Sequence, residues 1–141
     1  MGKISLKRVI LGGLIAGIVD CFFTFQLDGA FFHYFTWPAL FQGKVHIGSD
    51  DFTGLLILGL VGGILSMWVY AAIRPRFGAG VKTATIAGVT TFVIGTLMRN
   101  IFVVTFFEKI DKHAWMYATI GAFFVVPIST IAGAYFYKDK E

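Results

Sequence analysis

Four long apolar stretches alternate with short polar segments along this chain of 141 residues. They cover residues 9–30, 52–73, 83–107 and 115–137. Each stretch is about as long as the roughly 20 residues that a helix needs to cross a bilayer. A lone strand cannot satisfy its backbone hydrogen bonds in lipid, so each stretch is predicted to be a helix. The pattern therefore predicts an all-α membrane protein, built as one four-helix transmembrane bundle.

Composition supports the same class. Of the residues, 57% are hydrophobic and 14% are charged, whereas a soluble domain carries about 25% charged residues. The first apolar stretch continues past Phe25 without a small-residue cleavage site, so it is predicted to be a retained span rather than a signal peptide. Cys21 is the only cysteine, which excludes an intrachain disulfide, and it is expected to lie in the bilayer as a small apolar group.

The basic residues divide unequally between the two sides of the predicted bundle. Loops rich in Lys and Arg stay in the cytoplasm, so both termini and the segment 74–82 are predicted to be cytoplasmic. The net charge of +4 then reflects topology and does not indicate nucleic acid. Eight basic residues lie on the predicted cytoplasmic side and three on the other, and these are Lys3, Lys7, Arg8, Arg74, Arg76, Lys82, Lys138 and Lys140 against Lys44, Lys109 and Lys112.

The segment RPRFGAGVK, residues 74–82, is the predicted cytoplasmic hairpin. Pro75 is expected to end the second helix, because proline lacks an N–H and clashes with the preceding turn. The glycines let the chain reverse. The three cations are expected to hold this loop at the inner face of the membrane, in contact with anionic lipid headgroups.

A short internal repeat accompanies this layout. IAGIV at 15–19 matches IAGVT at 86–90, and each begins a span shortly after basic residues. The second and fourth spans also end alike, in WVYAAIR and AYFYK. These matches indicate two helical hairpins repeated in the same orientation.

The central hairpin also resembles a known pattern. WVYAAIRPRFGAGVKTA, residues 68–84, is similar to the Trp-Leu-Tyr-Ala-Ala-Ile-Arg-Pro-Arg-Phe-Gly-Pro-Gly-Pro-Lys-Thr-Ala hairpin of a family of small bacterial four-helix membrane proteins. GAYFYK near the end resembles the family's Gly-Ala-Trp-Leu-Tyr-Lys. Ala79 and Val81 stand where the family often has proline, which is expected to loosen the loop. The resemblance implies this topology and the inner membrane of a bacterium, and it carries over no catalytic residue.

Three ionisable residues fall within the first and third spans. Such groups cost about 2.5–3.5 kcal/mol each at the bilayer centre, so they usually pair or line a polar cavity. At about 1.5 Å per residue, Arg99 lies roughly 26 Å beyond Lys82. On the same scale Asp28 lies roughly 30 Å beyond Arg8, and Asp20 roughly 18 Å. The depths predict an intramembrane ion pair between Arg99 and Asp28, with Asp20 as the alternative partner or as part of a proton relay.

Two small-residue patterns predict close helix contacts. Gly13 and Gly17 are four residues apart in the first span, and Gly59 and Gly63 are four apart in the second. Small residues at this spacing let two helix backbones approach closely in a membrane. The expected contact is within the bundle, and the alternative is contact with another membrane subunit.

The loop at 31–51 contains the densest aromatic cluster of the chain. Trp and Tyr favour the headgroup level of a bilayer, so this interfacial aromatic surface is expected to lie on the outer leaflet. The alternative is a docking surface for a pigment, a quinone or a partner protein. Its residues are Phe31, Phe32, Tyr34, Phe35, Trp37 and Phe41.

The histidines give little sign of a metal or haem site. His33, His46 and His113 lie at or beyond the outer ends of the spans, and no two have the i, i+4 spacing. They are expected to be interfacial or solvated, so no cofactor and no metal is predicted, with contact to haem, pigment or quinone as the alternative.

The function predicted from these features is structural. The sequence shows no nucleophile with a base, no paired catalytic carboxylates and no phosphate loop, so no enzymatic activity is predicted. We expect an accessory or scaffolding subunit of a larger membrane complex, with lipids and other membrane subunits as partners. One alternative is a small oligomeric transporter or channel, and another is a haem or quinone redox subunit. The transporter would use the polar set Asp20, Thr24, Gln26, Asp28, Thr90, Thr91, Arg99 and Asn100.

Overall fold

A computed structural model describes residues 5–27, 49–106 and 112–137. Within these ranges the chain is all-helical and has no strand, which confirms the predicted class. η2 is a π-helical turn that joins α4 and α5 into one continuous helix, so four long helices result. The elements are α1 (Leu6–Leu27), α3 (Ser49–Phe77), α4 (Val81–Thr91), η2 (Phe92–Leu97), α5 (Met98–Phe106) and α6 (Lys112–Phe136).

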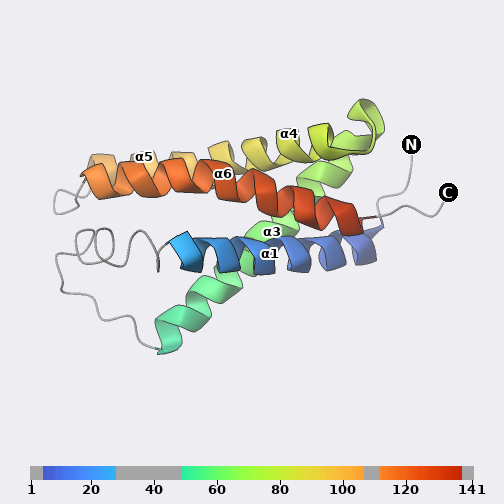
Figure 1. Cartoon of the computed structure of the whole chain (residues 1–141). Coiled ribbons are helices and arrows are strands. Elements are labelled where there is room, and N and C mark those ends of the chain that lie inside the picture. The colour runs from blue at the N-terminus through green and yellow to red at the C-terminus, as the bar shows by residue number, and fades with distance from the viewer. Residues whose placement is uncertain (1–4, 28–48, 107–111, 138–141) are drawn as a thin grey trace.

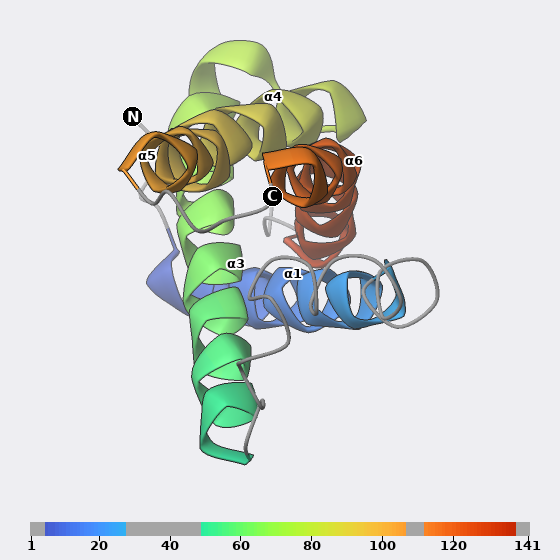
Figure 2. The same ribbon diagram turned by 90° about the vertical axis from the view of Figure 1, so that its left-hand side faces the viewer.

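The helices do not form a regular parallel bundle. The α4–α5 helix and α6 lie side by side, while α3 crosses α1 steeply in both views (Figures 1 and 2). The first turns of α3 project beyond α1 (Figure 2). With 29 residues, α3 is about 44 Å long, longer than the roughly 30 Å hydrocarbon core. A helix of that length fits a bilayer by tilting.

Three helices are long and apolar enough to cross a membrane, as expected of a multi-pass membrane protein. They are Leu56–Phe77, Val81–Phe102 and Trp115–Phe136. Among the described residues α1 does not join them, and it carries Lys7, Arg8 and Asp20. The first predicted span therefore forms a helix of 22 residues, and its crossing of the membrane stays a prediction.

The expectation that Pro75 ends the second helix is wrong. α3 continues through Pro75 to Phe77. Proline in the last turn removes only its own N–H bond, and the next turn still closes, because the Gly78 N–H donates to the Arg74 carbonyl over 2.8 Å. The helix ends at Phe77, and Gly78 follows with a φ of 81°, the left-handed conformation typical of a C-terminal cap. The Thr83 hydroxyl then donates to the Gly78 carbonyl over 2.8 Å and closes the turn.

α1 and α3 touch through their backbones. A Cβ added at Gly13 would lie 2.5 Å from the Ile64 Cα, and one at Gly17 would lie 2.7 Å from the Leu60 Cα. On the facing helix, a Cβ at Gly63 would meet the Gly13 carbonyl oxygen and the Gly17 amide nitrogen. The two glycine pairs named from the sequence therefore lie at the crossing point of these helices.

α6 packs against its neighbours in the same way. A Cβ at Gly88 of α4 would lie 2.5 Å from the Pro127 Cα, and one at Gly133 would lie 2.5 Å from the Gly12 carbonyl oxygen. Ala16 and Ala87 are fully buried beside these contacts. Small residues on α1 and α4 thus allow both helices to lie directly on α6.

The buried core lies toward one end of the bundle. This is the end at which α1 begins, α6 ends and the α3–α4 turn lies (Figure 1). The continuous core cluster there consists of Val9, Ala16, Met67, Tyr70, Ala71, Ala84, Ala87 and Tyr137. The first turns of α3 are far from it, and Ile57 and Leu58 are exposed there. Among the described residues the continuous core cluster therefore lies at one end of the bundle.

We predict that Gly63→Ala destabilises the bundle by about 1–3 kcal/mol, which is typical of overpacking. The new Cβ would collide with backbone atoms of Gly13 and Gly17, which cannot rotate away as a side chain does. The matched control is Gly62→Ala, one residue earlier on α3, where an added Cβ meets no atom of the described residues within 4 Å. Thermal unfolding in detergent micelles measures both variants, and equal unfolding temperatures would contradict the crossing.

Candidate functional site

Asp20 lies between α1 and α6. Its carboxyl group hydrogen-bonds with the side chain of Ser129, which is buried on α6. The Ser129 hydroxyl is also 2.9 Å from the Val126 carbonyl oxygen. A hydroxyl has a single proton, so it donates to one of these two oxygens at a time. This contact links the first and last helices through a half-buried carboxylate.

Only part of the predicted ion pair lies within the described residues. Asp28 lies outside the described residues, so its pairing with Arg99 stays a prediction. Arg99 is exposed on α5, while Asp20, the alternative partner, meets Ser129 instead. An exposed arginine in this span is expected to reach toward the headgroups, since its long side chain allows the charge to leave the hydrocarbon.

A second polar link joins α5 to α6. The Asn100 side-chain amide donates to the Thr119 hydroxyl over 2.7 Å, and that hydroxyl donates to the Trp115 carbonyl over 2.7 Å. Asn100 is 5% exposed. Its Oδ1 and the Trp115 Nε1 are buried without a hydrogen-bond partner in the described part of the chain. Sequence reasoning identified Asn100 as a polar residue of the span but missed Thr119 and Trp115.

The π-helical turn η2 precedes this link directly. It covers Phe92–Leu97, and α5 begins at Met98. A π-helical turn contains one residue more than an α-helical turn. It therefore rotates the residues that follow it by about 100° relative to an uninterrupted α-helix. The turn therefore sets which face of α5 meets α6, and it places Asn100 on that face.

The packed end of the bundle contains an aromatic and cationic cluster. The rings of Tyr70 and Tyr137 meet edge to face with centroids 5.7 Å apart. The Arg74 guanidinium carbon lies 5.4 Å from the centroid of the Tyr137 ring. Both tyrosines are buried, at 2% and 6% exposure. The similar ends WVYAAIR and AYFYK thus meet in space, which the sequence signalled only as a repeat.

The remaining polar residues of the transporter hypothesis make no hydrogen bond with these two links in the described part of the chain. Thr90 and Thr91 donate to carbonyls of their own helix, to Ile86 over 2.8 Å and to Ala87 over 2.9 Å. Thr24 is exposed on α1, and the side chain of Gln26 lies outside the described part. The structure therefore brings Asp20 to Ser129 and Asn100 to Thr119 as two separate links.

Several predicted features fall outside the described residues. The whole interfacial aromatic surface does so (Phe31, Phe32, Tyr34, Phe35, Trp37 and Phe41), as do His33 and His46. His113 is exposed near the start of α6. Within the described ranges no three residues of His, Cys, Asp or Glu come together as metal ligands. The predictions for this loop stay predictions.

Comparison with known proteins identifies no relative, so the functional proposal below is based on the geometry just described. No family model matches the sequence, and neither the curated proteins nor the solved structures include a significant match.

We predict that Arg99→Leu destabilises the protein and that adding Asp28→Asn partly restores it. A charge left without its partner in the membrane costs more than a pair removed together. A double-mutant cycle on unfolding free energies in micelles is expected to give a coupling of at least about 0.5 kcal/mol. Lys112→Leu, which removes an exposed cation from α6, is the control. If Arg99 couples with neither Asp28 nor Asp20, the pairing hypothesis fails.

Proposed function

We propose that this chain is a non-catalytic integral membrane protein of the bacterial inner membrane and serves as an accessory or scaffolding subunit of a larger complex. Three described helices that are long and apolar enough to cross a membrane support the part of this proposal that makes it a multi-pass membrane protein. The observation that carries the proposal is the way buried hydroxyl groups are used. They donate hydrogen bonds to the protein's own backbone carbonyls, in helices that contact one another at glycine residues.

The buried hydroxyls illustrate this use. Ser66 donates to the Gly62 carbonyl over 3.0 Å, and Thr130 donates to the Val126 carbonyl over 2.7 Å. Both side chains are almost fully buried. A transport path exchanges such hydrogen bonds with a passing solute, whereas these hydroxyls are satisfied by carbonyls of their own helices. Their arrangement favours a packed, structural interior.

The projecting part of α3 supplies a surface for a partner. Gly54, Leu58 and Gly62 follow at intervals of four and share one face of the helix. Leu58 is 65% exposed, and among the described residues an added Cβ at either glycine would meet no atom within 4 Å. Glycines on an exposed apolar helix face allow another membrane helix to approach its backbone closely. We therefore assign the partner contact to this face of α3.

Copurification tests the subunit role. The tagged chain is expressed at its native level and extracted in mild detergent, and the proteins that remain bound are identified. Gly54→Leu and Gly62→Leu are expected to remove the specific partner and leave thermal unfolding unchanged, because the new side chains fill the surface through which the partner approaches. Asp20→Asn is the control and is expected to keep the partner. Retention of the partner by both glycine variants would contradict the assigned face.

The second candidate is a small oligomeric transporter, and the Asp20–Ser129 contact favours it. A carboxylate placed between two helices of a membrane protein is a usual component of a proton path. The purified protein in liposomes distinguishes the two functions. A scaffold is expected to give no solute or proton flux above that of empty liposomes. Flux that Asp20→Asn abolishes would overturn the scaffold proposal.

The proposed membrane orientation leads to a further prediction. The start of α1, the end of α6 and the 78–80 turn lie at one end of the molecule (Figure 1), and this end is proposed to be cytoplasmic because it carries most of the basic residues. After Cys21 is replaced, a cysteine at exposed position 79 is expected to react with an impermeant maleimide only when the inner face is accessible. Labelling from the outer face of intact cells would invert the topology.

A further inference from the structure

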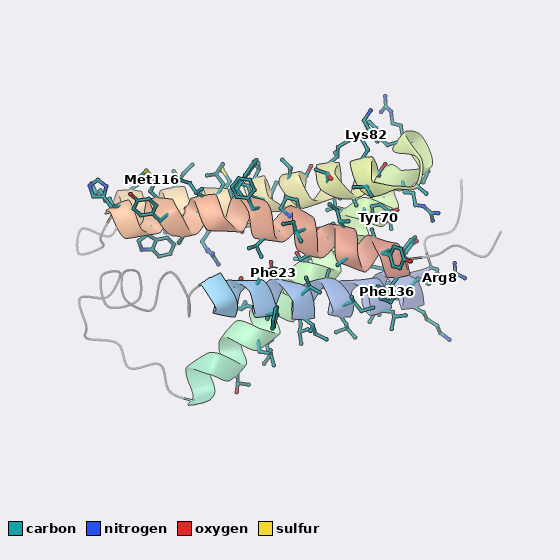
Figure 3. The ribbon with its side chains drawn as sticks, viewed as in Figure 1. Arg8, Phe23, Tyr70, Lys82, Met116 and Phe136 are labelled. Atoms are coloured by element: carbon teal, nitrogen blue, oxygen red, sulfur yellow. The ribbon has the colours of Figure 1, made fainter. Side chains whose placement is uncertain are left out.

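A cavity of about 500 Å³ lies at the packed end of the bundle, between the end of α3, the start of α4 and the end of α6. Its lining includes the aromatic and cationic cluster of Tyr70, Arg74 and Tyr137. Figure 3 shows Arg8, Tyr70 and Lys82 at this same end of the molecule. The cavity thus lies where membrane-crossing helices end.

The lining has a cationic part and an apolar part. The half-buried Arg74 supplies the positive charge and is held in place over the Tyr137 ring. Ala84, Ile131 and Ala134 supply an apolar wall on α4 and α6. A ligand that matches both parts carries an anion at one end and hydrocarbon at the other.

The charge around the cavity has one sign among the described residues. Cations at this end come from the start of α1, the end of α3 and the start of α4, and they are Lys7, Arg8, Arg74, Arg76 and Lys82. The described acidic residues lie elsewhere, at Asp20 within α1 and at Asp50 and Asp51 in the first turn of α3. Basic pockets between membrane helices attract anionic lipid headgroups.

We propose that this cavity binds one anionic phospholipid. The headgroup phosphate is bound by Arg74, and an acyl chain lies along Ala84, Ile131 and Ala134. The α4 N-terminus adds to the attraction, since Gly80 supplies no side-chain cap and the positive end of the helix dipole faces the headgroup region. A free phosphate ion would leave the apolar wall uncovered, which is why a lipid is the occupant that fits.

Native mass spectrometry of the full chain, released from mild detergent with added lipid, tests this proposal. Titration with phosphatidylglycerol is expected to show one retained lipid, bound more tightly than phosphatidylcholine. Arg74→Gln is expected to weaken phosphatidylglycerol about tenfold, as typical for the loss of a charge-assisted hydrogen bond. The matched control is Arg76→Gln, which removes the same charge from an exposed residue that does not line the cavity, and less than about a threefold effect is expected.

A second variant separates the cavity from the charge. Ala134→Leu retains every cation and fills the apolar part of the cavity, so it is also expected to lose the retained lipid. Thermal unfolding without added lipid verifies that each variant is folded, and if Arg74→Gln is not, Ala134→Leu decides. Inorganic phosphate at millimolar concentration is expected not to displace the lipid.

Four results would overturn the proposal. The first is equal weakening by Arg74→Gln and Arg76→Gln, which would show general attraction to a basic surface. The second is equal retention of phosphatidylcholine. The third is displacement by inorganic phosphate, which would make this a site for a free anion. The fourth is full retention of the lipid by folded Ala134→Leu, which would place the lipid elsewhere.

Discussion

The backbone contact between α1 and α3 is the constraint on which the rest of this structure depends. Lipid provides little hydrophobic drive for two apolar helices to associate, so their association depends on fit. Here the two helices fit because the contact residues have no side chains: Gly63 lies against Gly13 and Gly17 with no room for a Cβ. Since α3 crosses α1 steeply at this point, the same contact fixes the tilt of the longest helix. It also carries the end of α3, with Tyr70 and Arg74, toward the end of α6.

Close backbone contact at small residues also joins α1 and α4 to α6. In IAGIV and IAGVT the alanine is fully buried, and the glycine lies against another helix, at Leu60 for Gly17 and at Pro127 for Gly88. Gly88 lies against the Cα and the nitrogen of Pro127, and this nitrogen carries no hydrogen. Each half of the chain thus uses one Ala-Gly pair in a close contact with another helix, and α6 gains a second contact at Gly12. Many large apolar side chains, such as Leu11, Leu65 and Phe124, therefore face outward.

The sequence predicted the helices well, because length and hydropathy decide where they form. It predicted less about how each helix is rotated about its own axis, which decides the residues that face a neighbouring helix. Depth along a helix follows from counting, so Asp20 was correctly placed within α1, but counting does not tell which face meets α6, and its contact with Ser129 was missed. The register change at η2 had no signal in FVIGTL, which contains no proline, and the Asn100–Thr119 link depends on it. At Pro75 the sequence contains a signal to end the helix, but the helix continues, because proline has little effect in a last turn that Gly78 closes.

The asymmetry of the core connects packing with the proposed role. The buried cluster occupies the end where tyrosines, arginines and the helix turn meet, so this half holds the bundle together and carries the cavity that we propose as a lipid site. Toward the other end, α3 diverges from the bundle and exposes Leu58 between two glycines. A subunit that must retain its fold while docking needs these tasks on separate surfaces, because a contact shared by both would couple partner release to unfolding. Gly62 and Gly63 show the separation at its smallest scale, since neighbouring residues of one helix face the outside and the crossing point.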